Sequence, residues 1–246
     1  MPHTTGSLEL ARGFAETSRV LLGHASLERT MEAVAVCAPA CVQSADSACV
    51  SIVTRDGAVQ TPTCSDQSCS EPPGLPIALE AGSGLVDAAA ADGSQLHIDD
   101  TATEERWPEF ARRAAELGVR SLVACGLQVG SGLRAALILE SAKPGAFDGP
   151  ALEAAGVYAT HASAAISKSQ TTDSLRHAVR TRQMIGEATG ILMERRRIDS
   201  AAAFEMLVHA SQNLNVKLRA VAEHVVRTGQ EPQTLRRSDL PPTPAD

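Results

Sequence analysis

Residues 175–226 read LRHAVRTRQMIGEATGILMERRRIDSAAAFEMLVHASQNLNVKLRAVAEHVV, and this stretch decides the fold of the C-terminal part of the chain. Apolar residues recur in it three or four positions apart, which is the period of an amphipathic helix. The three successive stripes are Leu175, Val179, Ile185, Ala188 and Leu192; Ala203, Phe204, Leu207, Val208 and Ala210; and Leu218, Val221, Ala222, Val225 and Val226. The spacing therefore predicts three consecutive helices that pack through these faces.

Short polar residues mark the ends of these helices. Asp199 or Ser200 can cap the second helix and Asn215 the third, because such side chains accept a hydrogen bond from an unpaired backbone N–H. Gly229 follows the last apolar residue, where a left-handed conformation ends many helices. We therefore expect the helical region to end at residue 228.

The order of short motifs in this stretch resembles that of the ANTAR domain, a three-helix RNA-binding module of bacterial antitermination regulators. The motifs are Ile-Gly-x-Ala-x-Gly-Ile-Leu-Met, Ala-Phe, Ser-x-x-x-Asn and Lys-Leu-Arg. The family usually has lysine between the alanine and the second glycine, and Thr189 stands there in this chain. Carried over by motif, the RNA-binding residues implied by the resemblance are Arg182, Thr189, Ser211, Asn215, Lys217 and Arg219.

Two further features of this stretch bear on RNA. Gly186 and Gly190 lie inside the first helix, where each costs about 1 kcal/mol relative to alanine. The cost indicates a close approach there, and we favour a neighbouring helix over an RNA backbone. Arg195, Arg196 and Arg197 are expected to combine a favourable interaction with the helix C-terminus and nonspecific attraction of phosphate.

Composition and charge divide the chain in two. Only 2% of its 246 residues are aromatic, so its cores must be built from alanine, valine, leucine and isoleucine. Residues 1–170 carry 11 basic and 20 acidic side chains, a net charge of −9, whereas residues 171–246 carry 11 and 9, a net charge of +2. A polyanionic partner is therefore expected at the C-terminal part.

Neither a signal peptide nor a long apolar run is legible, so we expect a cytoplasmic protein without a membrane partner. The cysteines are expected to be thiols: Cys37, Cys41, Cys49, Cys64, Cys69 and Cys125. Their spacing does not match a zinc site, and the histidines show no ligand pattern, so no metal and no cofactor is predicted.

The N-terminal part alternates short strands with helices. Helices are expected within 8–42, in the second half of 75–91 and from Trp107 to Leu117, and strands at 48–54, 58–62, 95–98, 119–129 and 133–141. Asp56-Gly57 and Gly130-Ser131-Gly132 are hairpin turns. Mostly antiparallel neighbours make this an α+β domain.

This part also resembles a known family. Residues 106–148 look like the second half of a GAF domain, and residues 78–100 are similar to its glycine-containing pocket segment and the following strand. The resemblance covers about residues 18–168 and implies a small-molecule pocket or a dimerisation surface, without identifying a ligand. Within it we assign Trp107, Gly84 and Leu85 to the ligand pocket.

The expected organisation is an α+β protein with an antiparallel GAF-like sheet and flanking helices, a helical linker and a three-helix bundle. Between the two domains, small and apolar residues from Leu152 to Ser169 follow the alternating three-four spacing of a coiled-coil seam. The boundaries are 1–17 for an N-terminal segment, 18–150 for the GAF-like domain, 151–174 for the linker, 175–228 for the ANTAR domain and 229–246 for a disordered, proline-rich tail.

Three functions remain open at this stage. The resemblances imply a homodimeric, non-enzymatic antitermination regulator that binds hairpins in nascent transcripts, under control of a small-molecule or protein signal at the GAF domain. The second is a DNA-binding transcription factor that reads bases with the start of the third helix. The third is a GAF-type redox sensor or reductase that uses Cys64 and Cys69.

Overall fold

The computed structural model describes residues 21, 23, 26–53, 59–65, 84–130 and 134–239. The chain divides into two compact units, which we call the sheet unit (1–173) and the helical unit (174–246). A single long helix, α6 (Gly149–Arg196), contributes to both.

The sheet unit is built on five strands in the order β2-β1-β5-β4-β3, and every neighbouring pair is antiparallel. The strands are β1 (Ser47–Val53), β2 (Val59–Cys64), β3 (Gln95–Ile98), β4 (Ser121–Gln128) and β5 (Arg134–Ser141). The pairing of β1 with β2 and of β4 with β5 confirms both predicted hairpins, although their turns lie outside the described residues. The strand β2 extends two residues beyond position 62, where the predicted strand ended.

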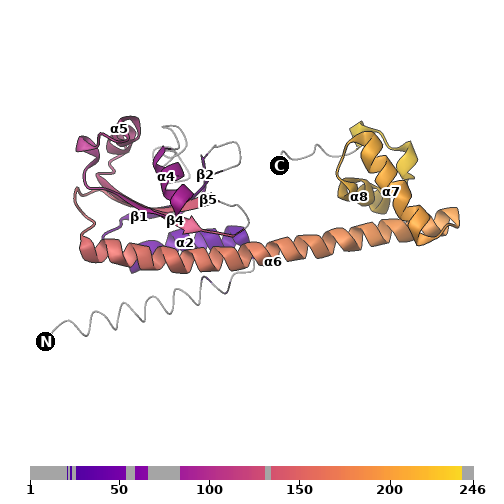
Figure 1. Cartoon of the computed structure of the whole chain (residues 1–246), viewed down its shortest axis with the longest axis horizontal. Coiled ribbons are helices and arrows are strands. Elements are labelled where there is room, and N and C mark those ends of the chain that lie inside the picture. Colours follow the sequence, from indigo (N-terminus) through magenta and orange to yellow (C-terminus); the bar gives the residue numbers. More distant parts are fainter. Residues whose placement is uncertain are drawn as a thin grey trace. The chain divides into compact units, whose positions relative to one another are not determined.

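Helices cover both faces of this sheet. The helix α2 (Leu27–Cys41) and the first half of α6 lie on one face, and α4 (Gly84–Asp92) and α5 (Pro108–Glu116) lie on the other (Figure 1). The alternation of side chains along β5 divides the core accordingly, because Leu137 and Leu139 pack towards α2 and α6 while Ile138 packs towards α4 and α5. Both faces are therefore apolar.

Close packing compensates for the scarcity of aromatic residues. Gly126 on β4 lies directly beneath α4, where a Cβ atom would stand 2.0 Å from the carbonyl oxygen of Ala89. On the opposite face, the buried hydroxyl of Tyr158 on α6 donates to the carbonyl oxygen of Val34 on α2 at 2.7 Å. Small residues allow helix and sheet to approach, and this hydrogen bond fixes one helix against the other.

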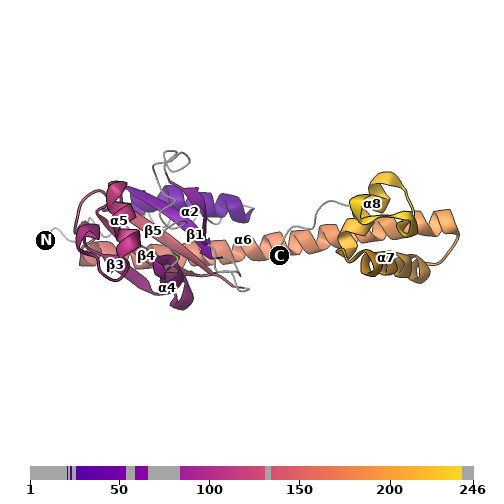
Figure 2. The same cartoon turned by 90° about the horizontal axis from the view of Figure 1, so that it is seen from above.

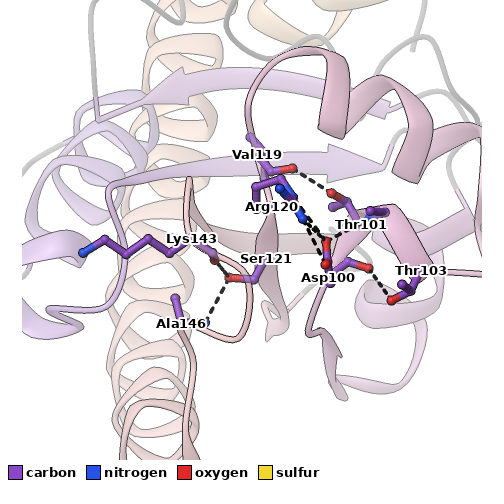
Figure 3. A network of polar contacts seen from close by, with 9 residues as sticks. Asp100, Thr101, Thr103, Val119, Arg120, Ser121, Lys143 and Ala146 are labelled. Atoms are coloured by element: carbon purple, nitrogen blue, oxygen red, sulfur yellow. Dashed lines mark hydrogen bonds and ion pairs between the residues drawn. The ribbon is translucent and has the colours of Figure 1, made fainter.

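Hydrogen bonds join the acidic turn after β3 to the residues that precede β4 (Figure 3). Asp100 accepts from the backbone N–H of Ala102 at 3.0 Å, and Arg120 Nη2 donates to both of its carboxylate oxygens at 3.0 Å. The Ala102 N–H, followed by the guanidinium, lowers the pKa of Asp100. The hydroxyl of Thr101 donates to the carbonyl oxygen of Val119 at 2.9 Å, so this turn has a structural role.

The predicted coiled-coil linker is wrong over most of its length. The small and apolar residues from 152 to 169 face the sheet, and Ala155, Ala162 and Ile166 are fully buried in the core of the sheet unit. Three-four spacing serves packing on a sheet as well as packing on another helix, which is why the sequence did not distinguish them. The helix then continues without a break through Gln170–Ser174.

The helical unit contains the C-terminal part of α6 together with α7 (Ser200–Leu214) and α8 (Leu218–Thr228), which flank the end of α6 (Figure 2). Its core joins the three predicted stripes: Ala188, Leu192, Ala203, Leu207, Ala210, Val221, Ala222 and Val225 are buried together. Leu175 and Val179, assigned to the first stripe, are each 64% exposed instead.

The predicted caps are confirmed at two of three places. Asp199 accepts from the N–H of Ala202 at 2.8 Å, and Gly229 ends α8 with a φ of 68°. Asn215 does not cap α8. It ends α7 in the left-handed region (φ 50°, ψ 52°), which asparagine tolerates better than most residues, and Lys217 takes the N-cap position of α8.

The tail differs from the disordered segment that was predicted. Short 3₁₀ turns form at Pro232–Thr234 and Arg237–Asp239, and Leu235 is buried in the core of the helical unit. Arg237 Nη1 donates to the carbonyl oxygens of Leu214 and Asn215 at 3.0 and 2.8 Å. Leu235 and Arg237 thus help to hold a segment whose composition alone indicates disorder. Residues 240–246 lie outside the described residues.

Candidate nucleic-acid interface

Four of the six predicted RNA-binding residues lie in or beside the turn between α7 and α8: Ser211 on α7, Asn215 and Lys217 in the turn, and Arg219 on α8. Ser211 holds this turn closed: its hydroxyl donates to the carbonyl oxygen of Val216 at 2.7 Å, and the N–H of Val216 donates back to the Ser211 carbonyl oxygen at 3.0 Å. Ser211 is half-buried. The structure therefore gives this serine a positioning role, because its only proton is directed inwards.

Asn215 and Lys217 are exposed on the outside of the same turn. The left-handed backbone of Asn215 reverses the chain, and its carbonyl oxygen is held by Arg237 while the side-chain amide faces solvent. Lys217 precedes the first turn of α8, whose backbone N–H groups attract anions. An ammonium group beside a helix N-terminus is an arrangement that suits a phosphate.

Arg219 connects this turn to α6. Its Nη1 lies 2.7 Å from Nε2 of His177, so the imidazole nitrogen must accept the hydrogen bond. The guanidinium carries five N–H donors and is only half-buried, which leaves donors for a second partner. We call Ser211, Asn215, Lys217, Arg219 and His177 the corner cluster; His177 had not been predicted from the sequence.

Arg182 and Thr189 lie elsewhere. They are seven residues apart on α6, so their side chains share one face of this helix. Each residue turns the helix by about 100°, so this face is rotated roughly 140° from the face that carries His177. Arg182 is exposed, whereas the hydroxyl of Thr189 donates to the Ile185 carbonyl oxygen of its own helix at 2.7 Å. The six predicted residues therefore form two groups. Four lie around the turn between α7 and α8, and two lie on a face of α6 that points away from the face of His177.

Arg195 and Arg196 hold the C-terminal segment. The guanidinium of Arg195 donates to the carbonyl oxygen of Gly229, which completes the C-terminus of α8, and Arg196 pairs with Glu231. Arg197 remains highly exposed, 3.7 Å from Glu194. The contacts of Arg195 and Arg196 could not be predicted from the sequence, because both are made with the segment after α8, whose composition indicates disorder.

The residues assigned to a ligand pocket in the sheet unit lie together. A Cβ atom on Gly84 would stand 3.1 Å from Cδ1 of Trp107, the residue before α5, so the indole covers this glycine. The guanidinium carbon of Arg106 lies 4.6 Å from the indole centroid. Leu85 is buried in the core cluster beneath α4 and α5. The segment 66–83, which precedes α4, lies outside the described residues.

Only one of the two cysteines considered for redox chemistry lies among the described residues. Cys64 is the direct cross-strand neighbour of Cys49, and Cys69 lies outside the described residues. The contact with Cys64 and burial raise the pKa of the Cys49 thiol, and burial raises that of Cys125 to about 12. Because the thiolate is the reactive form, these environments disfavour Cys49 and Cys125 as nucleophiles.

Among the described residues, no three His, Cys, Asp or Glu side chains gather closely enough to hold a metal ion. Nor does any helix there have the length and apolarity needed to cross a membrane.

Comparison with known proteins gives a sequence match for the C-terminal part of the chain and a structural likeness for the sheet unit. Residues 173–226 match the sequence profile of the ANTAR domain. No curated protein matches the chain by sequence. Its sheet unit has the fold of GAF domains, as solved structures show.

Three of these structures illustrate the likeness. The photosensory core module of a phytochrome from Stigmatella aurantiaca aligns with a TM-score of 0.62 and 10% identity over 89% of this chain, which spans only 47% of that one. The GAF domain of a phosphoenolpyruvate-protein phosphotransferase from Acinetobacter aligns with a TM-score of 0.50 and 10% identity, over 70% of this chain and 97% of that domain. The GAF domain of a sensor histidine kinase from Pseudomonas syringae aligns with a TM-score of 0.50 and 16% identity, over 71% of this chain and 96% of that domain. Such identities establish the fold and no ligand.

Proposed function

We propose that this chain, in which a GAF-like domain precedes an ANTAR domain, is a signal-responsive RNA-binding regulator of transcription antitermination. The match of residues 173–226 to the ANTAR domain carries the proposal. The corner cluster supports it, because Lys217 and Arg219 place two cations beside an exposed amide at the start of α8. The net charge of +2 over residues 171–246 has the sign that a polyanion requires.

The RNA target is a hairpin loop in a nascent transcript. Unpaired bases in loops are recognised by polar side chains and arginine planes, while phosphate contacts supply affinity. We assign phosphate contacts to Lys217 and Arg219 and base contacts to the Asn215 amide, with Ser211 positioning the turn. Arg182 and Thr189, on the other face of α6, are secondary candidates.

The regulator acts by shifting the population of RNA structures. Binding favours the hairpin fold over a competing terminator only by the difference in affinity for the two. The GAF-like domain supplies the control by binding a small-molecule or protein signal, with Trp107, Gly84 and Leu85 near its site. The protein acts as a homodimer in the cytoplasm, without enzymatic activity and without a resident cofactor.

Hairpin binding tests this proposal directly. The purified chain is titrated into a pool of stem-loop transcripts, and into duplex DNA of matched sequence, at low ionic strength and then at rising salt. We expect tighter binding of stem-loops than of duplex, and a large loss of affinity in the double variant Lys217→Ala, Arg219→Ala at unchanged helix content. Arg227→Ala, which removes an exposed cation from the opposite end of α8, is the matched control. Equal affinity of the double variant, or preference for duplex DNA, contradicts the proposal.

A further inference from the structure

Cys49 and Cys64 face each other across the first two strands of the sheet unit. Their positions pair directly in the antiparallel ladder between β1 and β2. The next pair along, Ala48 and Ser65, is joined by a hydrogen bond of 2.8 Å from the Ser65 N–H to the Ala48 carbonyl oxygen. Since hydrogen-bonded and non-hydrogen-bonded pairs alternate along such a ladder, the two cysteines form a non-hydrogen-bonded pair, in which side chains lie closer together.

This position suits a disulfide bond. The Cα atoms of a non-hydrogen-bonded pair are about 4.5 Å apart, and disulfides span Cα separations of about 4.4 to 6.8 Å. The two thiols are already in hydrogen-bonding contact. Cys37 and Cys41, four residues apart on α2, are less suitable. Side chains at that helical spacing have Cβ atoms about 5–6 Å apart, whereas a disulfide requires about 3.5–4.5 Å.

The two thiols differ in their access to solutes. Cys64 is half-buried on β2, an edge strand of the sheet, whereas Cys49 is only 1% exposed. The contact with Cys64, burial and the carboxyl group of Glu140 raise the pKa of the Cys49 thiol, so this thiol keeps its proton. An oxidant in solution therefore reaches Cys64 first, and Cys49 reacts with the sulfur that it already contacts.

We propose that Cys49 and Cys64 are a site of reversible oxidation, which hydrogen peroxide converts to a disulfide with Cys64 as the attacking thiol and Cys49 as the resolving thiol. In the first step the Cys64 sulfur attacks one peroxide oxygen. An S–O bond forms, the O–O bond breaks, and the departing hydroxide takes the Cys64 proton and leaves as water. In the second step the Cys49 sulfur displaces the hydroxyl group of this sulfenic acid. The S–S bond forms, the S–O bond breaks, and the hydroxide leaves as water with the Cys49 proton, so two thiols lose two electrons and one peroxide becomes two waters.

The product suits its surroundings better than a thiolate does. Cys49 is buried in the apolar cluster beneath α4 and α5, and Cys64 packs against this cluster. Glu140 is buried on the same face of the sheet, because its cross-strand neighbour Ser47 is two residues from Cys49 on β1. A disulfide has no charge, so its formation places no second anion beside this carboxyl group. The bond ties the edge strand β2 covalently to β1, and neither the proposal nor its test depends on RNA binding.

Peptide mapping of the full chain tests the bond. The reduced protein is treated with hydrogen peroxide, its remaining thiols are blocked with N-ethylmaleimide, and the denatured chain is cut with trypsin, which cleaves after Arg55 between the two cysteines. We expect two peptides joined through Cys49 and Cys64, identified by tandem mass spectrometry and separated by dithiothreitol. Oxidation of Cys64 without this link, or its pairing with Cys69 instead, overturns the proposal.

Alanine variants then assign the two roles. Cys49→Ala should accumulate a sulfenic acid at Cys64 that dimedone traps, whereas Cys64→Ala should give about tenfold less adduct at Cys49, because the buried thiol is not reached from solution. The matched control is Cys125→Ala, the same change at a thiol on β4 that is 2% exposed, and it should keep the link. Equal adduct yields in the first two variants, or loss of the link in a folded control, overturn the assignment. The wild-type map needs no variant, so it decides the proposal even where a variant fails to fold.

Discussion

Arg219 of α8 and His177 of α6 are held together by a hydrogen bond of 2.7 Å between Nη1 and Nε2. The two residues are 42 positions apart in the sequence, and their contact places the guanidinium of Arg219, a member of the corner cluster, against the first helix of the bundle. Any RNA contact made by Arg219 is therefore made by a side chain that is already partly ordered.

Replacing these residues separately should distinguish contact from positioning. We expect Arg219→Ala to weaken hairpin binding about five- to tenfold and to reduce the slope of log affinity against log salt by about 1, because one phosphate contact is lost. His177→Ala should weaken binding less, and should have little further effect in the Arg219→Ala background. Fluorescence anisotropy over a salt series measures both quantities. Additive effects of the two replacements would show that His177 does not act through Arg219.

The left-handed conformation of Asn215 permits its two roles to be separated. Asn215→Ala should destabilise the helical unit by about 1 kcal/mol, because a Cβ atom without a compensating polar group is strained at φ 50°. Asn215→Gly should be close to wild type in stability. Both variants lack the amide, so both should bind the hairpin more weakly if this group reads a base. Thermal unfolding followed by circular dichroism checks the first expectation; equal stability of the two variants would contradict it.

The C-terminal segment should contribute measurably to stability. Leu235 is 6% exposed, and Leu235→Ala should cost about 2 kcal/mol or more through lost burial and the cavity that it leaves. Gln233→Ala, at an exposed position of the same segment, should change the free energy of unfolding by less than about 0.5 kcal/mol. Urea unfolding of the two variants makes the comparison. Indistinguishable midpoints would mean that the segment is not packed.

A buried carboxyl group makes the stability of the sheet unit depend on pH. Burial raises the pKa of Glu140 to about 8 from 4.5, and its Oε2 accepts from the Ser47 hydroxyl at 3.1 Å. The folded state therefore keeps a proton that the unfolded state releases. This contribution to stability is complete below pH 4.5, and it is lost as the pH rises to about 8.

Glu140→Gln should remove this dependence, because the amide is neutral throughout and still offers an oxygen to Ser47. At pH 8 the variant should exceed the wild type in stability by an amount on the order of a few kcal/mol, with a difference that vanishes towards pH 4. Fluorescence of Trp107, the only tryptophan, follows unfolding of the sheet unit. A difference in stability that does not change with pH would contradict the assignment.

Local sequence signals predicted most of the helices and strands, because the ends of such elements depend on residues that are close in the sequence. Gln95–Ile98 is a strand as predicted, Pro108 begins α5, and Asp199 caps α7. Contacts between distant residues were not accessible in this way. The apolar stripe around Ala155 packs on a sheet, and the sequence could not show which surface it would meet.

Residues of the candidate site that belong to family motifs were predicted, whereas those that join the site through distant contacts were not. Family motifs identified Lys217 and Arg219, whereas His177 and Arg237 enter through contacts over 42 and 22 residues that no local pattern records. Asn215 was expected to cap the following helix. An asparagine between two helices satisfies the rule for an N-cap and the rule for a left-handed C-terminus equally well, and only the backbone decides between them.

The continuity of α6 limits how such a protein can be rearranged by recombination or by design. The same helix belongs to both units without an intervening loop, so exchanging the sheet unit means splicing inside a helix. Each inserted residue would turn everything downstream by about 100°, and insertions of seven would nearly restore the original phase. Under the proposed regulation, chimaeras should therefore respond to the signal only at certain splice lengths.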